Sequence, residues 1–291
     1  MDTLLQSIKN AMKNVMDLNS TIDTATDNFH NEKMHTENKE LPFSIYTSIH
    51  EQNLLNVPIV KPLLIVVFNG EKVLGKQGEL VCQVGRFIFL SDSPAINMRN
   101  IPIEEEYFAL LIEFDSQDYA GLNVQASHKK HYCIGDTTES LKKCLLQFIE
   151  SSLWAPTQIV SSRKREILEL LCHMGHEEIL SMLGSSQIGQ RLHTMFNEQG
   201  FHELTLESIC EQLAMSESTL RRKLKMEGTS VQEIKDQARL GLGLHLLQTT
   251  LFSISTIAEE CGYQSQSRFT ERFKGRFGLT PSELRKTIMT E

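Results

Sequence analysis

Near the C-terminal end of the 291-residue chain, one short stretch places basic and hydroxyl side chains opposite an apolar stripe. Leu220 and Leu224 have the spacing of a buried helix face. At about 100° per residue, the opposite face of that helix carries Ser218, Arg222 and Lys225, with Arg221 beside them. A guanidinium group can donate paired hydrogen bonds to guanine, a hydroxyl can contact base edges, and an ammonium group can contact phosphate. The stretch therefore carries side chains suited to reading DNA, although a solvated amphipathic helix has the same pattern.

A second stretch, about fifty residues further on, repeats this arrangement around three phenylalanines, Phe269, Phe273 and Phe277. If these are buried, the exposed side of the helix and its start carry Gln266, Ser267, Arg268, Thr270, Glu271 and Lys274. The Glu271 carboxylate has two possible roles. It can accept a hydrogen bond from the N4 amino group of cytosine, or it can pair with Arg268 or Lys274 on the helix surface.

Both stretches belong to an internal repeat, in which residues 205–235 can be laid over residues 253–285. Each copy has a hydroxyl residue before a short apolar helix, a tight turn, and a serine that opens a second helix; these residues are Thr205, Ser216, Ser253 and Ser265. Capping-box patterns follow at Ser230 to Glu233 and at Thr280 to Glu283. A longer helix over 231–249 would hold the copies at a fixed separation. The repeat therefore predicts two helix-turn-helix units.

Residues 205–285 resemble the double helix-turn-helix domain of AraC/XylS-type transcriptional regulators. The resemblance rests on a long motif comprising Ile254, Ile257, Ala258, Cys261, Gly262, Tyr263, Ser267, Phe269, Phe273, Lys274, Phe277, Gly278, Thr280, Pro281, Ser282 and Arg285. Residues 41–115 also resemble, more weakly, the N-terminal domain of one branch of this family. The matching positions there are Tyr46, Ser48, His50, Gln52, Leu54, Leu55, Pro62, Leu63, Leu64, Val67, Gly70, Lys72, Tyr107, Ala109 and Leu110.

The chain departs from the family pattern at two positions. Ala214 stands in the first turn where relatives usually have glycine, and a left-handed conformation there would cost about 1 kcal/mol. Glu271 stands where relatives commonly have arginine, which bears on the bases that are read.

The N-terminal part predicts a different architecture. Short β-branched and aromatic runs over 62–68, 80–84, 86–90 and 108–114, separated by glycine turns, predict an antiparallel barrel or sandwich. The resemblance implies a cupin-like barrel that holds an effector. Apolar helical spacing over 137–153 and 162–183 predicts connecting helices, which either pack on the barrel or form a dimer interface. We therefore expect an α+β chain with four parts: a helix and polar tether over 1–40, a cupin-like effector domain over 41–135, connecting helices over 136–189, and a DNA-binding domain over 190–291.

The net charge of −8 falls entirely on residues 1–189, since residues 190–291 carry equal numbers of acidic and basic side chains. This excludes a general polybasic nucleic-acid binder but not two short basic helices. No apolar run is long enough to span a membrane, and the six scattered cysteines form no C-x-x-C pair. These features predict a cytoplasmic protein, and the resemblance to AraC/XylS-type regulators implies a bacterial one associated with the nucleoid through DNA.

The sequence predicts no catalytic residue, no metal and no cofactor. It contains no H-x-H pair, phosphate loop or nucleophile elbow. The histidine pairs His128 with His131 and His173 with His176 lack an evident third ligand.

Together these features predict a sequence-specific DNA-binding transcriptional regulator, an activator rather than a repressor, whose N-terminal domain senses a signal or dimerises. Its expected partners are duplex promoter DNA, RNA polymerase, a second copy of the chain and a small-molecule effector; the effector-binding residues are unknown. The alternative is a cupin-like small-molecule sensor whose C-terminal helical domain is mainly a protein-interaction module. Basic outward-facing helices favour the regulator, since a protein-interaction surface would favour exposed aromatic residues.

Overall fold

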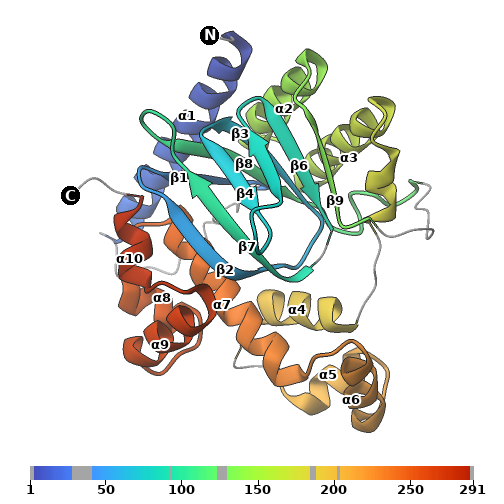
Figure 1. Cartoon of the computed structure of the whole chain (residues 1–291). Coiled ribbons are helices and arrows are strands. Elements are labelled where there is room, and N and C mark those ends of the chain that lie inside the picture. Colours follow the sequence, from blue (N-terminus) through green and yellow to red (C-terminus); the bar gives the residue numbers. More distant parts are fainter. Residues whose placement is uncertain are drawn as a thin grey trace.

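The computed structural model describes residues 3–27, 41–91, 93–122, 130–183, 188–201 and 204–288; the side chains of residues 16–27 and 93–94 lie outside this description. Its N-terminal part contains two antiparallel sheets, and its C-terminal part is helical (Figure 1). The expected α+β class is confirmed.

The first sheet has the strand order β1-β8-β3-β6-β9, and the second has the order β2-β7-β4-β5. The strands of the first sheet are β1 (Ser44–Ser48), β8 (Tyr107–Glu113), β3 (Leu63–Asn69), β6 (Arg86–Leu90) and β9 (Tyr132–Asp136). Those of the second are β2 (Gln52–Ile59), β7 (Ser93–Ile101), β4 (Glu71–Leu74) and β5 (Leu80–Gln83). Glycines in the left-handed region, such as Gly70 and Gly85, make the tight turns between consecutive strands.

The first sheet is buried on both faces, which explains the continuous apolar run of β3. Leu64 and Val66 face a core shared with α1 (Thr3–Asp27), α2 (Glu139–Ser152), α3 (Thr157–His173) and the 3₁₀ turn η1 (Glu177–Ser181). Leu63 and Ile65 point the other way, into a core shared with the second sheet. Figure 1 shows α1, α2 and α3 on the side of the first sheet away from β2 and β4.

Two helix boundaries differ from the sequence prediction. The first helix continues to Asp27, through residues expected to begin a polar tether, whereas residues 28–40 lie outside the described chain. The helix predicted over 162–183 begins at Thr157, directly after Pro156, and ends at His173. Gly175 is left-handed, with φ 94°, and the chain continues as η1. The apolar residues of α2 and α3, among them Phe148 and Leu168, lie within the chain's own core.

Seven helices form the C-terminal part. They are α4 (Ile188–Gln199), α5 (Leu206–Gln212), α6 (Glu217–Met226), α7 (Val231–Thr249), α8 (Ile254–Glu260), α9 (Gln266–Phe277) and α10 (Pro281–Lys286), counted over the described residues. The bounds of α7 match the predicted helix over 231–249. Among the described residues, no helix is both long and apolar enough to cross a membrane.

The C-terminal half of α7 and helices α8 to α10 pack directly on the sheets. Their buried residues, including Leu244 and Phe273, belong to the same core as those between the two sheets, while α4, α5 and α6 have a separate core. A bulge in β2 gives Asn56 a φ of 50°, and its side-chain amide donates a hydrogen bond of 3.2 Å to the carbonyl of Arg276 at the end of α9. The bulged strand thus connects the second sheet to the helical part of the chain.

Candidate nucleic-acid interface

The first unit exposes the side chains that the sequence analysis selected. Leu220 and Leu224 of α6 are buried, as the helical arithmetic predicts. Ser218, Arg221, Arg222 and Lys225 are all exposed. Arg221 forms an ion pair of 2.7 Å with Glu217 one turn earlier, which fixes its guanidinium group along the helix. The structure thus leaves the outward face of α6 open to a partner.

The second unit presents a similar face on α9. Phe269, Phe273 and Phe277 are fully buried and contact one another, with centroid distances of 5.5 and 4.6 Å between consecutive rings. Of the selected residues, Thr270 is half-buried, and the exposed ones are Gln266, Ser267, Arg268, Glu271 and Lys274.

The Glu271 carboxylate has no ion-pair partner within 4.0 Å among the described residues. The expected alternative of pairing with Arg268 or Lys274 is therefore not observed. The Glu271 carboxylate is exposed in the middle of the outward face of α9.

The turn inside each unit requires a left-handed residue. Ala214 has φ 52° between α5 and α6, and Gly262 has φ 73° between α8 and α9. Because a Cβ atom clashes in this region, the first turn is strained by about 1 kcal/mol relative to a glycine turn. The substitution is tolerated, as expected from the sequence.

The helix starts are capped as their sequences predict. The hydroxyls of Thr205, Ser216, Ser253 and Ser265 each accept a hydrogen bond from a backbone N–H in the first turn of the following helix. Thr280 and Glu283 form the complete capping box at α10. At α7 only half of the predicted box forms. Ser230 accepts from the Glu233 N–H at 3.2 Å, whereas the Glu233 carboxylate accepts from the Thr229 hydroxyl at 3.4 Å.

Helix α7 holds the two units apart, with α4–α6 at one end and α8–α10 at the other (Figure 1). Its 19 residues give a length of roughly 28 Å. Arg239, near its middle, lies 5.7 Å from the ring centroid of Phe201 in the first unit and 5.5 Å from that of Tyr263 in the second. At Gly243 a Cβ atom would lie only 2.7 Å from the ring of Phe269, so the missing side chain allows α9 to approach α7 closely. These contacts fix the spacing of the exposed faces.

Comparison with known proteins identifies this part of the chain. A family model described as "Helix-turn-helix domain" matches residues 209–287, which include α6, α7, α8, α9 and α10. Residues 209–287 are a helix-turn-helix domain of the AraC type.

Relatives of known function match about a third of the chain. The chain is 38% identical over 101 residues to the transcriptional regulator GadX of an Escherichia coli strain, and 34% identical over 103 residues to the transcriptional regulator YdeO of E. coli K12. Each match covers 35% of this chain, and they cover 37% and 40% of the two relatives, respectively.

A solved structure extends the likeness to the N-terminal part. ToxT from Vibrio cholerae superposes with a TM-score of 0.61 over 88% of this chain and 98% of its own, at 15% identity. The two proteins therefore share a fold across both parts of the chain.

One set of residues that the sequence analysis did not assign to a site connects the sheets to the helix-turn-helix domain. Gln52, Asn100 and Lys72 lie directly opposite one another on β2, β7 and β4. The buried Lys72 ammonium donates to the Asn100 side-chain carbonyl at 2.7 Å, and the Asn100 amide donates to the Gln52 side-chain carbonyl at 2.7 Å. Gln52 also accepts from the Gln248 amide of α7 at 3.0 Å and donates to the Thr287 hydroxyl at 2.9 Å.

The electrostatics of this row are unusual at Lys72. Its side chain is 1% exposed, and its ammonium lies 5.7 Å from the ring centroid of Tyr107. Burial lowers the pKa of Lys72 from its ordinary 10.5 to about 8. No carboxylate within the described chain forms an ion pair with it. Gln52 and Lys72 both belong to the N-terminal resemblance, but only the strand register brings them together.

Proposed function

We propose that the chain is a sequence-specific DNA-binding transcriptional regulator of the bacterial cytoplasm that activates transcription through contact with RNA polymerase. The observation that carries this proposal is the pair of exposed faces on α6 and α9, held at a fixed spacing by α7. An α-helix fits the major groove, and we expect the exposed Arg222 and Glu271 to contact base edges there. The regulatory function of GadX and YdeO supports the same conclusion.

A binding assay with the full chain tests this proposal. The duplex is the DNA upstream of the chain's own coding sequence, measured at two salt concentrations beside a shuffled duplex of equal composition. We expect preferential binding to the natural duplex, weakened by Arg222→Ala and unchanged by Lys143→Ala, which removes a positive charge from the exposed side of α2. Equal affinity for both duplexes would favour the alternative, a sensor whose helical domain binds proteins.

The proposal extends to the signal that the N-terminal part receives. A buried ammonium without a carboxylate partner is suited to an anionic group, and the row from Lys72 through Asn100 and Gln52 reaches α7. ToxT has been crystallised with an unsaturated fatty acid bound. We therefore propose a long-chain fatty acid as the effector, which acts by rearranging this row of side chains.

Isothermal titration of the full chain with oleate, below its micelle concentration, tests this extension. Saturable binding that Lys72→Met abolishes supports an effector at this row. Binding that survives Lys72→Met, or no binding, refutes it without affecting the DNA-binding proposal.

We also propose that the chain dimerises through the corner between α2 and α3. The apolar residues inside these helices are covered by the chain's own core, but Leu153, Trp154 and Ile159 at the corner are 48%, 73% and 43% exposed. Two copies would bring four helix-turn-helix units to DNA and raise the affinity through effective concentration. Sedimentation of the full chain at micromolar concentration should give a dimer that Trp154→Ser dissociates and Leu251→Ser, at an equally exposed apolar position, does not.

A further inference from the structure

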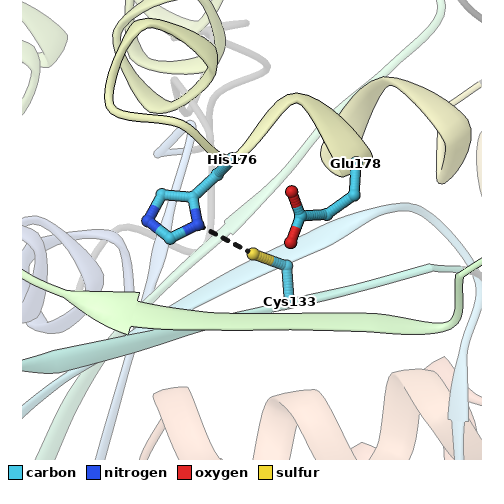
Figure 2. Close-up of side chains that lie close together, drawn as sticks. All are labelled: Cys133, His176 and Glu178. Atoms are coloured by element: carbon cyan, nitrogen blue, oxygen red, sulfur yellow. Dashed lines mark hydrogen bonds between the residues drawn. The ribbon is translucent and has the colours of Figure 1, made fainter.

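Three side chains with different ligand atoms meet where β9 faces the turn after α3. Cys133 lies on β9, His176 immediately precedes η1, and Glu178 lies within it. Cys133 Sγ is 3.3 Å from His176 Nδ1, and the ligand atoms of all three residues lie within 4.8 Å of one another. Figure 2 shows the three side chains directed toward a common point. The sequence alone indicates no third ligand beside His173 and His176, because Cys133 is distant in the chain.

The surrounding structure fixes the orientation of the His176 ring. The ring of Phe87 meets it edge-on, with centroids 5.2 Å apart. A Cβ atom at Gly135, which pairs with Phe87 across β6 and β9, would lie 2.7 Å from His176 Nε2, so glycine at this position leaves room for the imidazole. Cys133 is itself held in the sheet opposite Phe89. Nδ1 is therefore directed at the sulfur, and a ligand set held in place in this way binds a metal at a low entropic cost.

The chemistry of the three groups selects the ion. A thiolate, an imidazole and a carboxylate form a mixed sulfur, nitrogen and oxygen set that suits Zn²⁺ and disfavours Mg²⁺ or Ca²⁺. The thiolate and the carboxylate together balance the two positive charges of the ion. We propose that Cys133, His176 and Glu178 bind a Zn²⁺ ion, with a fourth position open to solvent beside the half-exposed His176 and Glu178.

A redox-sensing thiol or a simple ion pair would account for less of the geometry at this cluster. An oxidation-sensing cysteine needs an accessible thiolate, but Cys133 is only 3% exposed. An ion pair alone would explain only the contact between Glu178 and Lys130, whose nitrogen is 3.6 Å from the carboxylate. Neither role requires the imidazole to face the sulfur.

The position of the site indicates what zinc would change. The site joins β9 of the first sheet to η1, which lies in the chain shortly before α4 and the helix-turn-helix domain. Because the bound ion stabilises only the folded arrangement, it would stiffen the segment between the sheets and the DNA-binding helices. Zinc would therefore raise the thermal stability of the full chain.

Cobalt titration of the metal-free full chain tests this inference, because Co²⁺ bound to a thiolate gives a charge-transfer band in the near ultraviolet. We expect one equivalent of Co²⁺ to produce the band and Zn²⁺ to displace it. Cys133→Ser should remove the band, and Glu178→Gln should weaken Zn²⁺ binding by more than about 100-fold, beyond the loss of an outer hydrogen bond.

Matched controls keep the result interpretable. Cys144→Ser, at another buried cysteine, and His173→Gln, at an exposed histidine near the end of α3, should leave the band and the affinity unchanged. If Cys133→Ser loses its circular dichroism spectrum, the half-exposed Glu178→Gln variant decides the question. The absence of a stoichiometric band in the wild type, a band that persists in a folded Cys133→Ser variant, or unchanged zinc affinity in Glu178→Gln would overturn the proposal.

Discussion

Replacing Lys72 by methionine tests the assignment of a buried ammonium at the centre of the interdomain row. The substitution keeps the length of the side chain, removes the positive charge, and leaves the Asn100 carbonyl without its donor. The lost hydrogen bond costs about 1–3 kcal/mol at every pH. The charge contributes a second effect that depends on pH.

The sign and size of this second effect follow from the pKa of Lys72. In the folded chain burial lowers it to about 8, whereas the unfolded chain keeps the ordinary 10.5. Between these values the unfolded chain binds the proton that the folded chain has released, so the stability contributed by Lys72 rises with pH. A difference of about 2.5 pKa units corresponds to about 3 kcal/mol across the whole window.

Urea denaturation of wild type and Lys72→Met at several values between pH 7 and pH 10.5 measures this effect. We expect the free energy of unfolding of wild type, minus that of the variant, to increase steadily from about pH 8. Cysteines and tyrosines titrate in both proteins and largely cancel in the difference, apart from Cys82, which lies opposite Lys72 on β5. Lys76→Met, on the exposed turn after β4, provides the reference for the loss of a lysine. A difference that stays flat or decreases with pH would refute the burial of a charged Lys72.

Four further predictions concern the helical part of the chain. His193 is buried, and burial lowers its pKa from 6.5 to about 4, so the free energy of unfolding should decrease as the pH falls from about 6.5 to 4. His193→Gln should remove that decrease in urea titrations at pH 7 and 5, and equal decreases in wild type and variant would contradict the prediction. Ala214→Gly should raise the free energy of unfolding by about 1 kcal/mol because φ is 52° there, and thermal denaturation showing no gain would count against strain in the turn. Arg222→Ala should cost about 1–3 kcal/mol of DNA-binding free energy and relax the preference at one base position, whereas Lys225→Ala should lower the affinity for all sequences alike and reduce the slope of log affinity against log salt by about one. Identical sequence and salt profiles for the two variants would argue against base contact by Arg222. Glu271→Ala should lose affinity only at sites with a particular C·G pair, and equal shifts at every substituted operator would remove the base-reading role.

Local patterns were sufficient to predict the helical part. The caps at Ser216 and Ser265, the buried stripe through Leu220 and Leu224, and the limits of α7 all depend on residues a few positions apart in the chain. Helical periodicity and capping act over the same short range, so the sequence contains them directly. The exposed faces of α6 and α9 could be named residue by residue for the same reason.

The N-terminal part was predictable only in outline. The sequence indicates β3, β5, β6 and β8 but not β1, β2, β4, β7 or β9, which are polar, interrupted or distant from their partners. Strand register decides which side chains meet, and no local pattern specifies it here. This is why the row of Gln52, Asn100 and Lys72, and the approach of His176 to Cys133, emerge only from the structure.

Selection of binding sites from a pool of random duplexes, using the full chain, tests most directly whether α6 and α9 read DNA. We expect the selected duplexes to share two short conserved blocks, about one helical turn apart, because the two units face neighbouring major-groove segments. Arg222→Ala should lower the sequence conservation of one block, and Glu271→Ala should lower that of the other. A selected pool with no common sequence, or blocks that are unchanged in both variants, would contradict a DNA-reading role for these helices.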